Sequence, residues 1–78
     1  RGKNRKEVFI NLDKPMMPSE LVMKIYKSNS NTYFNLVSRA LSELKDKKLV
    51  EIVNPEDRTG RIYKRTKEGE KVAKELKE

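Results

Sequence analysis

Residues 37–51, VSRALSELKDKKLVE, join a helical pattern to a strand pattern. Val37, Leu41 and Leu44 repeat at spacings of four and three, which places them on one face of an α-helix. From Leu49 onward the apolar residues are mostly β-branched, as is typical of a strand. The stretch therefore predicts a helix that is followed closely by a strand.

The predicted helix begins upstream of this stretch and has two different faces. Ser30 or Asn31 can cap its first turn, and Phe34 and Ala40 extend the apolar stripe that is expected to face the core. The residues of the opposite face are Asn35, Ser38, Arg39 and Ser42. They are small or hydrogen-bonding groups, with few of the Glu/Lys pairs that a merely solvated face shows. This composition favours a binding role for the polar face.

A β-hairpin is predicted after this helix. The pair Asn54-Pro55 ends the first strand, and the segment around Ile62 and Tyr63 alternates as a second strand. Gly60 is expected to supply the positive φ of the connecting loop. Because Ile62 and Tyr63 point to opposite faces, we expect Ile62 to pack on the core and Tyr63 to lie at the edge.

Two shorter helices are predicted before residue 30. Val8, Phe9 and Leu12 form a short helical face, and Asn4 can cap the helix that carries it. A second helix is predicted from Pro18, because proline suits the first position of a helix.

The last predicted helix starts after Thr66, which can cap it. Its apolar residues Val72, Ala73 and Leu76 are expected to face inward. Gly69 lowers helix propensity by about 1 kcal/mol in the first turn, which suggests a close backbone contact. Together the patterns predict one domain, residues 1–78, that is mainly α with a small β-hairpin, in the order α-α-α-β-β-α.

The positive charge is high and is concentrated in two segments. Of 78 residues, 19 are Lys or Arg and 12 are Asp or Glu, so the net charge is +7, which favours a polyanionic partner. Residues 1–6 carry +4, and residues 54–67 carry five cations against two acids. We therefore expect a basic N-terminal arm at residues 1–6 and a basic hairpin at residues 54–65.

Catalysis, metal binding and membrane insertion are not indicated. The chain has no Cys and no His, which excludes disulfides, thiolate or imidazole metal sites, cysteine nucleophiles and histidine general bases. The three glycines, at positions 2, 60 and 69, form no glycine-rich phosphate loop. No apolar run approaches the roughly 20 residues of a membrane span. We expect a cytoplasmic, nucleoid-associated protein that is not an enzyme and uses no cofactor or metal.

Four segments carry a resemblance to a known family: PSELV at 18–22, VSRALSELKDKKLVE at 37–51, GRIYKRT at 60–66 and TKEG at 66–69. In this order the chain resembles, over residues 5–77, the winged helix-turn-helix domains of microbial transcription regulators, particularly the MarR-like and related archaeal groups. Lys48 stands where that family usually has a glycine between helix and strand. The resemblance implies that the third helix enters the DNA major groove and that residues 54–65 form a basic wing.

The candidate DNA-binding residues lie on the recognition helix, the wing and the arm. They are Thr32, Tyr33, Asn35, Ser38, Arg39 and Ser42 on the helix; Arg58, Thr59, Gly60, Arg61 and Lys64 on the wing; and Arg1, Lys3, Arg5 and Lys6 on the arm. An α-helix fits the major groove, where Arg39 could bind guanine O6 and N7, and Asn35 adenine N6 and N7. The wing and arm cations are expected on phosphates or in the minor groove.

Plainer explanations stay open for parts of this set. Arg39 could instead pair with Glu43 at i+4 on its own helix. The arm could be an ordinary solvated tail. The hairpin cations, Arg65 included, repel one another; a bound anion would relieve that repulsion, but Glu56 and Asp57 nearby could instead neutralise part of it.

The expected function is sequence-specific binding of double-stranded DNA in transcription regulation, with a homodimer that contacts two half-sites as a further expectation. The alternative is a winged-helix protein-interaction module within a larger transcription or replication assembly, which an exposed apolar patch on the third helix would favour. RNA binding is a third option, but two Phe and three Tyr provide few aromatic rings for base stacking.

Overall fold

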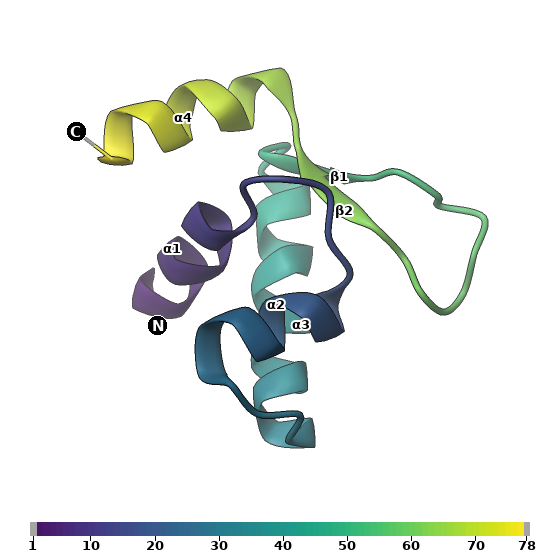
Figure 1. The fold of residues 1–78 in the computed structure, drawn as a ribbon. Coiled ribbons are helices and arrows are strands. Elements are labelled where there is room, and N and C mark those ends of the chain that lie inside the picture. Colours follow the sequence, from purple (N-terminus) through teal and green to yellow (C-terminus); the bar gives the residue numbers. More distant parts are fainter. Residues whose placement is uncertain (1, 78) are drawn as a thin grey trace.

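Four helices and one β-hairpin make up residues 2–77, the part of the chain that the computed structural model describes (Figure 1). The elements are α1 (Gly2–Asn11), α2 (Pro18–Tyr26), α3 (Asn31–Asp46), β1 (Val50–Ile52), β2 (Tyr63–Arg65) and α4 (Lys67–Lys77). The order α-α-α-β-β-α confirms the predicted fold class, a mainly helical domain with the winged-helix layout.

Helix α3 forms one wall of the core, as its apolar stripe predicted. Val37, Ala40, Leu41 and Leu44 are all buried, and α1 and α2 pack against this side of the helix. Among the described residues, the buried core is formed by Val8, Phe9, Leu12, Met16, Leu21, Val22, Val37, Ala40, Leu41, Leu44, Val50 and Ala73. The helix begins where the Ser30 hydroxyl accepts a hydrogen bond from the Thr32 amide at 3.1 Å, so Ser30 is the cap.

The hairpin is antiparallel, with Val50 opposite Arg65 and Ile52 opposite Tyr63. The segment between α1 and α2 adds one further rung, because Met16 and Tyr63 exchange both backbone hydrogen bonds, at 2.9 and 2.8 Å. Tyr63, not Ile62, packs against the core, so the predicted orientation of these two side chains was wrong. Residues two apart on a strand share a face, and Arg65 and Tyr63 both point toward the body of the protein.

Arg65 is a structural residue rather than a wing cation. Its side chain is only 5% exposed and donates to two carbonyls in the last turn of α1, Phe9 O at 2.9 Å and Ile10 O at 2.7 Å. The guanidinium also lies over the Phe9 ring, 5.3 Å from its centroid, and pairs with Glu70 at 3.4 Å. The last carbonyls of a helix have no partner within the helix, so Arg65 satisfies α1 from a distant part of the chain.

The predicted N-terminal arm is part of α1, so that prediction was wrong for residues 2–6. Helix α1 begins at Gly2, and Asn4 lies inside it instead of capping it. Lys, Arg and Glu are good helix formers, which explains why the helix extends through the basic segment. Arg5 pairs with Glu43 of α3 at 3.0 Å, whereas Lys3 and Lys6 are exposed. Arg1 lies outside the described residues.

Helix α4 begins after Thr66, as predicted, but Leu76 near its C-terminal end does not face the core as expected. The Thr66 hydroxyl accepts from the Gly69 amide at 3.0 Å and donates to the Lys48 carbonyl at 2.8 Å. Gly69 is buried, and a Cβ at this position would collide with the Leu49 carbonyl oxygen, which confirms the predicted close contact. Leu76 was predicted to face inward and is instead 41% exposed, because it lies beyond the part of α4 that packs on the core.

The turn between α3 and β1 contains a strained residue. Lys48 has a φ of +64°, a left-handed conformation that costs most non-glycine residues about 1–2 kcal/mol. Its neighbour Lys47 has an ordinary φ of −84°. The turn therefore requires the conformation that glycine adopts most readily, at the position where this chain has a lysine.

We expect Lys48→Gly to raise the free energy of unfolding by about 1 kcal/mol, because it removes the left-handed strain. The measurement is chemical denaturation followed by circular dichroism. Lys47→Gly removes the same charge from the preceding residue. It should lower the free energy of unfolding, because Lys47 has an ordinary φ and glycine there adds only flexibility to the unfolded chain. Equal effects of the two variants would contradict this explanation.

We expect Arg65→Met to lower the free energy of unfolding by about 2–3 kcal/mol, because the Ile10 carbonyl loses its Arg65 donor and the Phe9 carbonyl keeps only a long bond from the Leu12 amide, at 3.3 Å. Lys64→Met is the matched control. Lys64 is exposed and pairs only loosely with Glu51, at 3.6 Å, so its loss should change stability by less than about 0.5 kcal/mol. A similar small change for both variants would show that Arg65 does not hold α1.

Candidate nucleic-acid interface

The outward face of α3 presents the predicted polar residues. Asn35, Arg39 and Ser42 are exposed, and Ser38 beside them is partly buried. Within residues 2–77, none of these four side chains makes a hydrogen bond or ion pair with the protein. The donors and acceptors of this face are therefore available to a ligand. Thr32, from the predicted set, is exposed in the first turn of the same helix.

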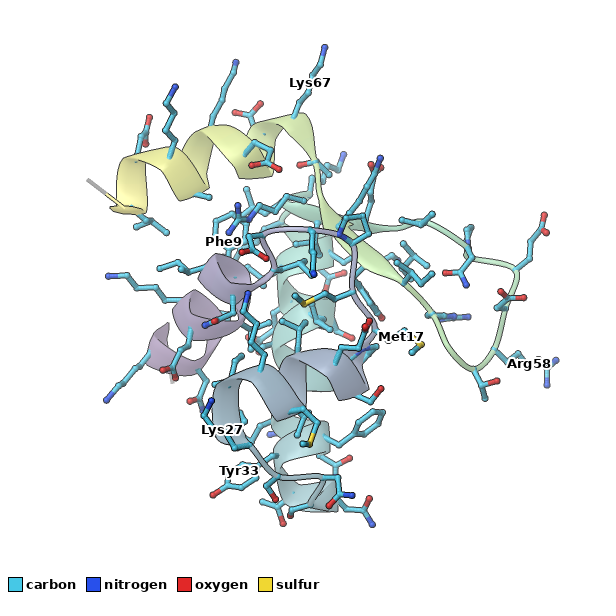
Figure 2. The ribbon with its side chains drawn as sticks, in the orientation of Figure 1. Phe9, Met17, Lys27, Tyr33, Arg58 and Lys67 are labelled. Carbon is cyan, nitrogen blue, oxygen red and sulfur yellow. The ribbon has the colours of Figure 1, made fainter. Side chains whose placement is uncertain are left out.

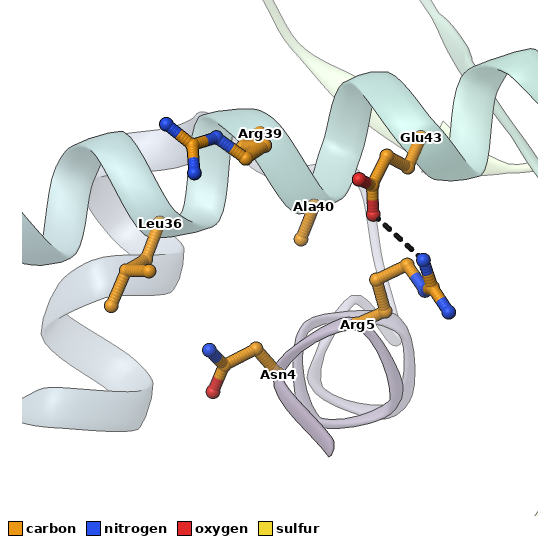
Figure 3. A pocket seen from close by; sticks show the side chains of 6 residues that line it. All are labelled: Asn4, Arg5, Leu36, Arg39, Ala40 and Glu43. Carbon is orange, nitrogen blue, oxygen red and sulfur yellow. Dashed lines mark hydrogen bonds and ion pairs between the residues drawn. The ribbon is translucent and has the colours of Figure 1, made fainter. Parts of the chain in front are cut away.

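Arg39 is not engaged by Glu43, the alternative partner on its own helix. Glu43 pairs with Arg5 across the α1–α3 contact instead, at 3.0 Å. Figure 3 shows the Arg39 guanidinium lying along α3, apart from the Arg5–Glu43 pair, in a hollow that Leu36 also lines. Of the two explanations that the sequence left open for Arg39, the intrahelical pair is excluded.

Tyr33 lies apart from the other candidates on α3. Its ring stacks on Tyr26 of α2, with centroids 4.3 Å apart and planes 5° from parallel, and it packs against the core. The Tyr26 hydroxyl in this pair is buried, and burial raises its pKa, with smaller contributions from Glu7 and Tyr33. One face of the Tyr33 ring is thus covered by the protein, which is a poor arrangement for a DNA contact.

Phe34 was predicted to be in the core and is instead 41% exposed. Tyr33, which precedes Val37 by four residues, takes the inward position, while Phe34 is left at the edge of the stripe. Met23 of α2 is 52% exposed and borders the same hollow as Phe34. The third helix therefore carries an exposed aromatic ring beside its polar face, which sequence reasoning missed.

The loop of the wing, residues 53–62, is organised by Asn54. Its side-chain amide donates to the Asp57 carboxylate at 2.8 Å and to the Gly60 carbonyl at 3.2 Å, and its side-chain oxygen accepts from the Ile62 amide at 2.7 Å. Gly60 has a φ of +67°, as predicted for this loop. Sequence reasoning treated Asn54 only as a strand breaker, although asparagine before a turn commonly bonds to the backbone that follows.

The cations of the wing differ in the hydrogen bonds and ion pairs that they make with the rest of the protein. Arg58, Thr59 and Gly60 are exposed, and Arg58 points away from the body of the protein at the tip of the wing (Figure 2). Arg61 is partly buried, and its Nε donates to the Asp57 carbonyl at 2.7 Å. Lys64 pairs with Glu51 on the neighbouring strand. Within the described part of the chain, Arg58 is thus the predicted wing cation that makes no ion pair or hydrogen bond with the protein.

The wing and the N-terminal half of α3 border one hollow, which we call the wing hollow. Phe34 of α3 and Met17 line one side of it, and wing residues 58–61 line the other. The backbone at Gly60 approaches Met17, since a Cβ there would lie 3.8 Å from the Met17 sulfur. None of the residues that line the hollow is acidic. The wing therefore lies beside the Phe34 side of α3, whereas the predicted helix residue Arg39 lines a separate hollow against α1.

The predicted arm residues lie elsewhere. Arg5 lines the hollow between α1 and α3, together with Arg39, and its guanidinium is used by Glu43. Lys3 and Lys6 are exposed on α1. The pKa of the Asp13 carboxyl is lowered by a hydrogen bond from Lys24, and Asp13 lines neither the wing hollow nor the hollow between α1 and α3.

We expect Asn54→Ala to loosen the wing loop and to lower the free energy of unfolding by about 1–2 kcal/mol, because three hydrogen bonds of the loop are lost. Hydrogen exchange of the Ile62 amide, measured by NMR, should become much faster. Asn29→Ala is the control, because Asn29 is an exposed loop residue that makes no side-chain hydrogen bond within residues 2–77. Unchanged protection at Ile62 would contradict the role of Asn54.

No helix within residues 2–77 has the length and apolar character that crossing a membrane requires. Comparison with protein families, with curated proteins and with solved structures finds no match to this chain.

Proposed function

We propose that this protein binds double-stranded DNA sequence-specifically in transcription regulation, with α3 in the major groove and the wing on the backbone or in the minor groove. The observation that supports the proposal is that the polar face of α3 makes no side-chain hydrogen bond or ion pair within the described residues, while an exposed wing arginine borders a hollow with Phe34 of the same helix. The resemblance to MarR-like and related archaeal regulators belongs to the proposal, as does a homodimer that contacts two half-sites.

The outward face of α3 suits the edges of base pairs. The major groove of B-DNA is wide enough for an α-helix, and each base pair presents a distinct set of donors, acceptors and methyl groups there. Arg39 has a guanidinium without a protein partner within the described residues, so it could bind guanine O6 and N7 with two hydrogen bonds. Asn35 could pair in the same way with adenine. Such bidentate contacts discriminate between bases by about 1–3 kcal/mol.

The charge distribution supports a polyanionic partner. The chain carries a net charge of +7, and the wing hollow is lined by Arg58 and Arg61 with no carboxylate. Arg61 is held by the Asp57 carbonyl but keeps its charge, since a carbonyl does not neutralise a guanidinium. Both arginines are therefore suited to contact phosphates of a strand that passes between the wing and α3.

A protein-interaction module is the second candidate, and one observation favours it. Phe34 and Met23 expose apolar surface around one hollow at the start of α3, which is the kind of patch that a protein partner would cover. The same winged-helix layout can serve either role, because fold alone does not define function. A DNA-binding measurement separates the two candidates.

We expect the protein to bind random-sequence duplex DNA at about 50 mM salt, with log K falling against log salt at a slope of about −5, because five or six phosphates are neutralised. In the variant Arg58→Ala/Arg61→Ala the slope should become shallower by roughly 1 to 2. The measurement is fluorescence anisotropy of a labelled duplex at several salt concentrations.

The control for this titration is Lys67→Ala/Lys71→Ala, which removes two positive charges from exposed positions of α4. Lys67 points away from the wing (Figure 2), so the slope of this variant should stay close to that of the wild type. An equal change in both variants would mean that net charge alone attracts DNA. Absence of duplex binding at about 50 mM salt would favour the interaction module.

A further inference from the structure

Phe34 is an aromatic ring that the inward packing of Tyr33 leaves partly exposed at the start of α3. It is the fourth residue of α3 and is 41% exposed, although Tyr33 beside it packs against the core. The other outward residues of α3 near it are polar, including Asn31, Asn35 and Ser38. Phe34 and Met23 together form an exposed apolar patch beside these polar residues, and such a patch with a polar rim is typical of a contact site.

Two hollows meet at Phe34, and their charge limits what could fill them. The wing hollow is bordered by Arg58 and Arg61, and the second hollow is bordered by Met23 and Asn31. No acidic residue lines either hollow, although the chain has 12 acids. The ligand is therefore expected to be anionic close to the wing and to present an apolar group to Phe34. Duplex DNA meets both requirements, because it combines phosphates with the methyl groups of thymine.

We propose that Phe34 is a specificity-determining residue that contacts the C5-methyl group of a thymine in the major groove, an inference that rests on the DNA binding proposed above. The thymine methyl is the apolar group that base pairs present in this groove, and a phenylalanine ring is among the side chains that contact it. Residues near the start of a recognition helix reach base edges, and Phe34 follows the Ser30 cap by four positions.

The expected change in affinity follows from the removal of one methyl group from water. Removing one methyl group from water against an apolar side chain changes an affinity by about fourfold. Polar contacts from Asn35 and Arg39 can coexist with this preference, because they lie toward the centre of the outward face of α3. Phe34 thus adds a preference for thymine that the hydrogen-bonding residues alone do not supply.

The test replaces the methyl group and leaves the rest of the DNA unchanged. A duplex is first selected with the wild-type protein from a library of random sequences, and each thymine is then replaced singly by deoxyuridine, which lacks the C5-methyl. We expect about fourfold weaker binding for at least one position. Phe34→Ala should bind the thymine and deoxyuridine duplexes equally at that position, with the salt dependence of the wild type, because Phe34 carries no charge.

Leu76→Ala is the matched control, because Leu76 is also 41% exposed but lies on α4. It should keep the wild-type preference for thymine over deoxyuridine. Phe34→Leu keeps an apolar side chain and provides a second variant if Phe34→Ala does not fold, as judged by circular dichroism; it should retain part of the preference.

The outcomes separate this inference from the proposed function. If the wild type binds the selected duplex and deoxyuridine is neutral at every position, the proposed role of Phe34 is wrong while DNA binding stands. If no duplex is selected and random duplex is not bound, both the proposed function and this inference fail.

Discussion

The guanidinium of Arg65 joins α1 to β2 and α4, which are neighbours in the sequence but lie far from α1 along the chain. From β2 it donates to the last turn of α1 at Phe9 and Ile10, lies over the Phe9 ring and pairs with Glu70 of α4. Within residues 2–77 the core consists of 12 buried apolar residues, which is a thin core with few other contacts to hold the elements together. A nearly buried cation is stable here because two carbonyl groups, a carboxylate and an aromatic face surround the guanidinium.

The direction of the wing depends on this contact. Arg65 and Tyr63 share a face of β2, so when Arg65 reaches α1, Tyr63 must face the core and Met16 can pair with its backbone. A shift of the hairpin by one residue would expose both side chains. The loop of the wing then leaves the body of the protein beside Met17 and Phe34, which is how it comes to border the same hollow as α3.

The buried and outward faces of α3 follow from helical spacing, except at Phe34. Residues at spacings of three and four form the buried stripe, and the residues between them form the polar outward face. Phe34 fits the stripe by spacing alone, but Tyr33 also fits, and the stack of Tyr33 on Tyr26 occupies the space at the start of the helix. The exposed Phe34 is thus a consequence of competition between two neighbouring rings for one position in the core.

Apart from the start of α1, the helices, the hairpin, the Thr66 cap and the close contact at Gly69 could be predicted from the chain, and Ser30 was one of two candidate caps for α3. Periodicity, capping and glycine conformation act over a few residues, which is why a sequence shows them. The roles of Arg65, Arg5 and Phe34 could not be predicted from the sequence. A charged residue in a basic segment looks the same in sequence whether it faces solvent, pairs with Glu43 or caps a distant helix. Those roles depend on which side chains meet after the elements pack, and contacts between residues more than 30 positions apart leave no periodic trace in a single sequence.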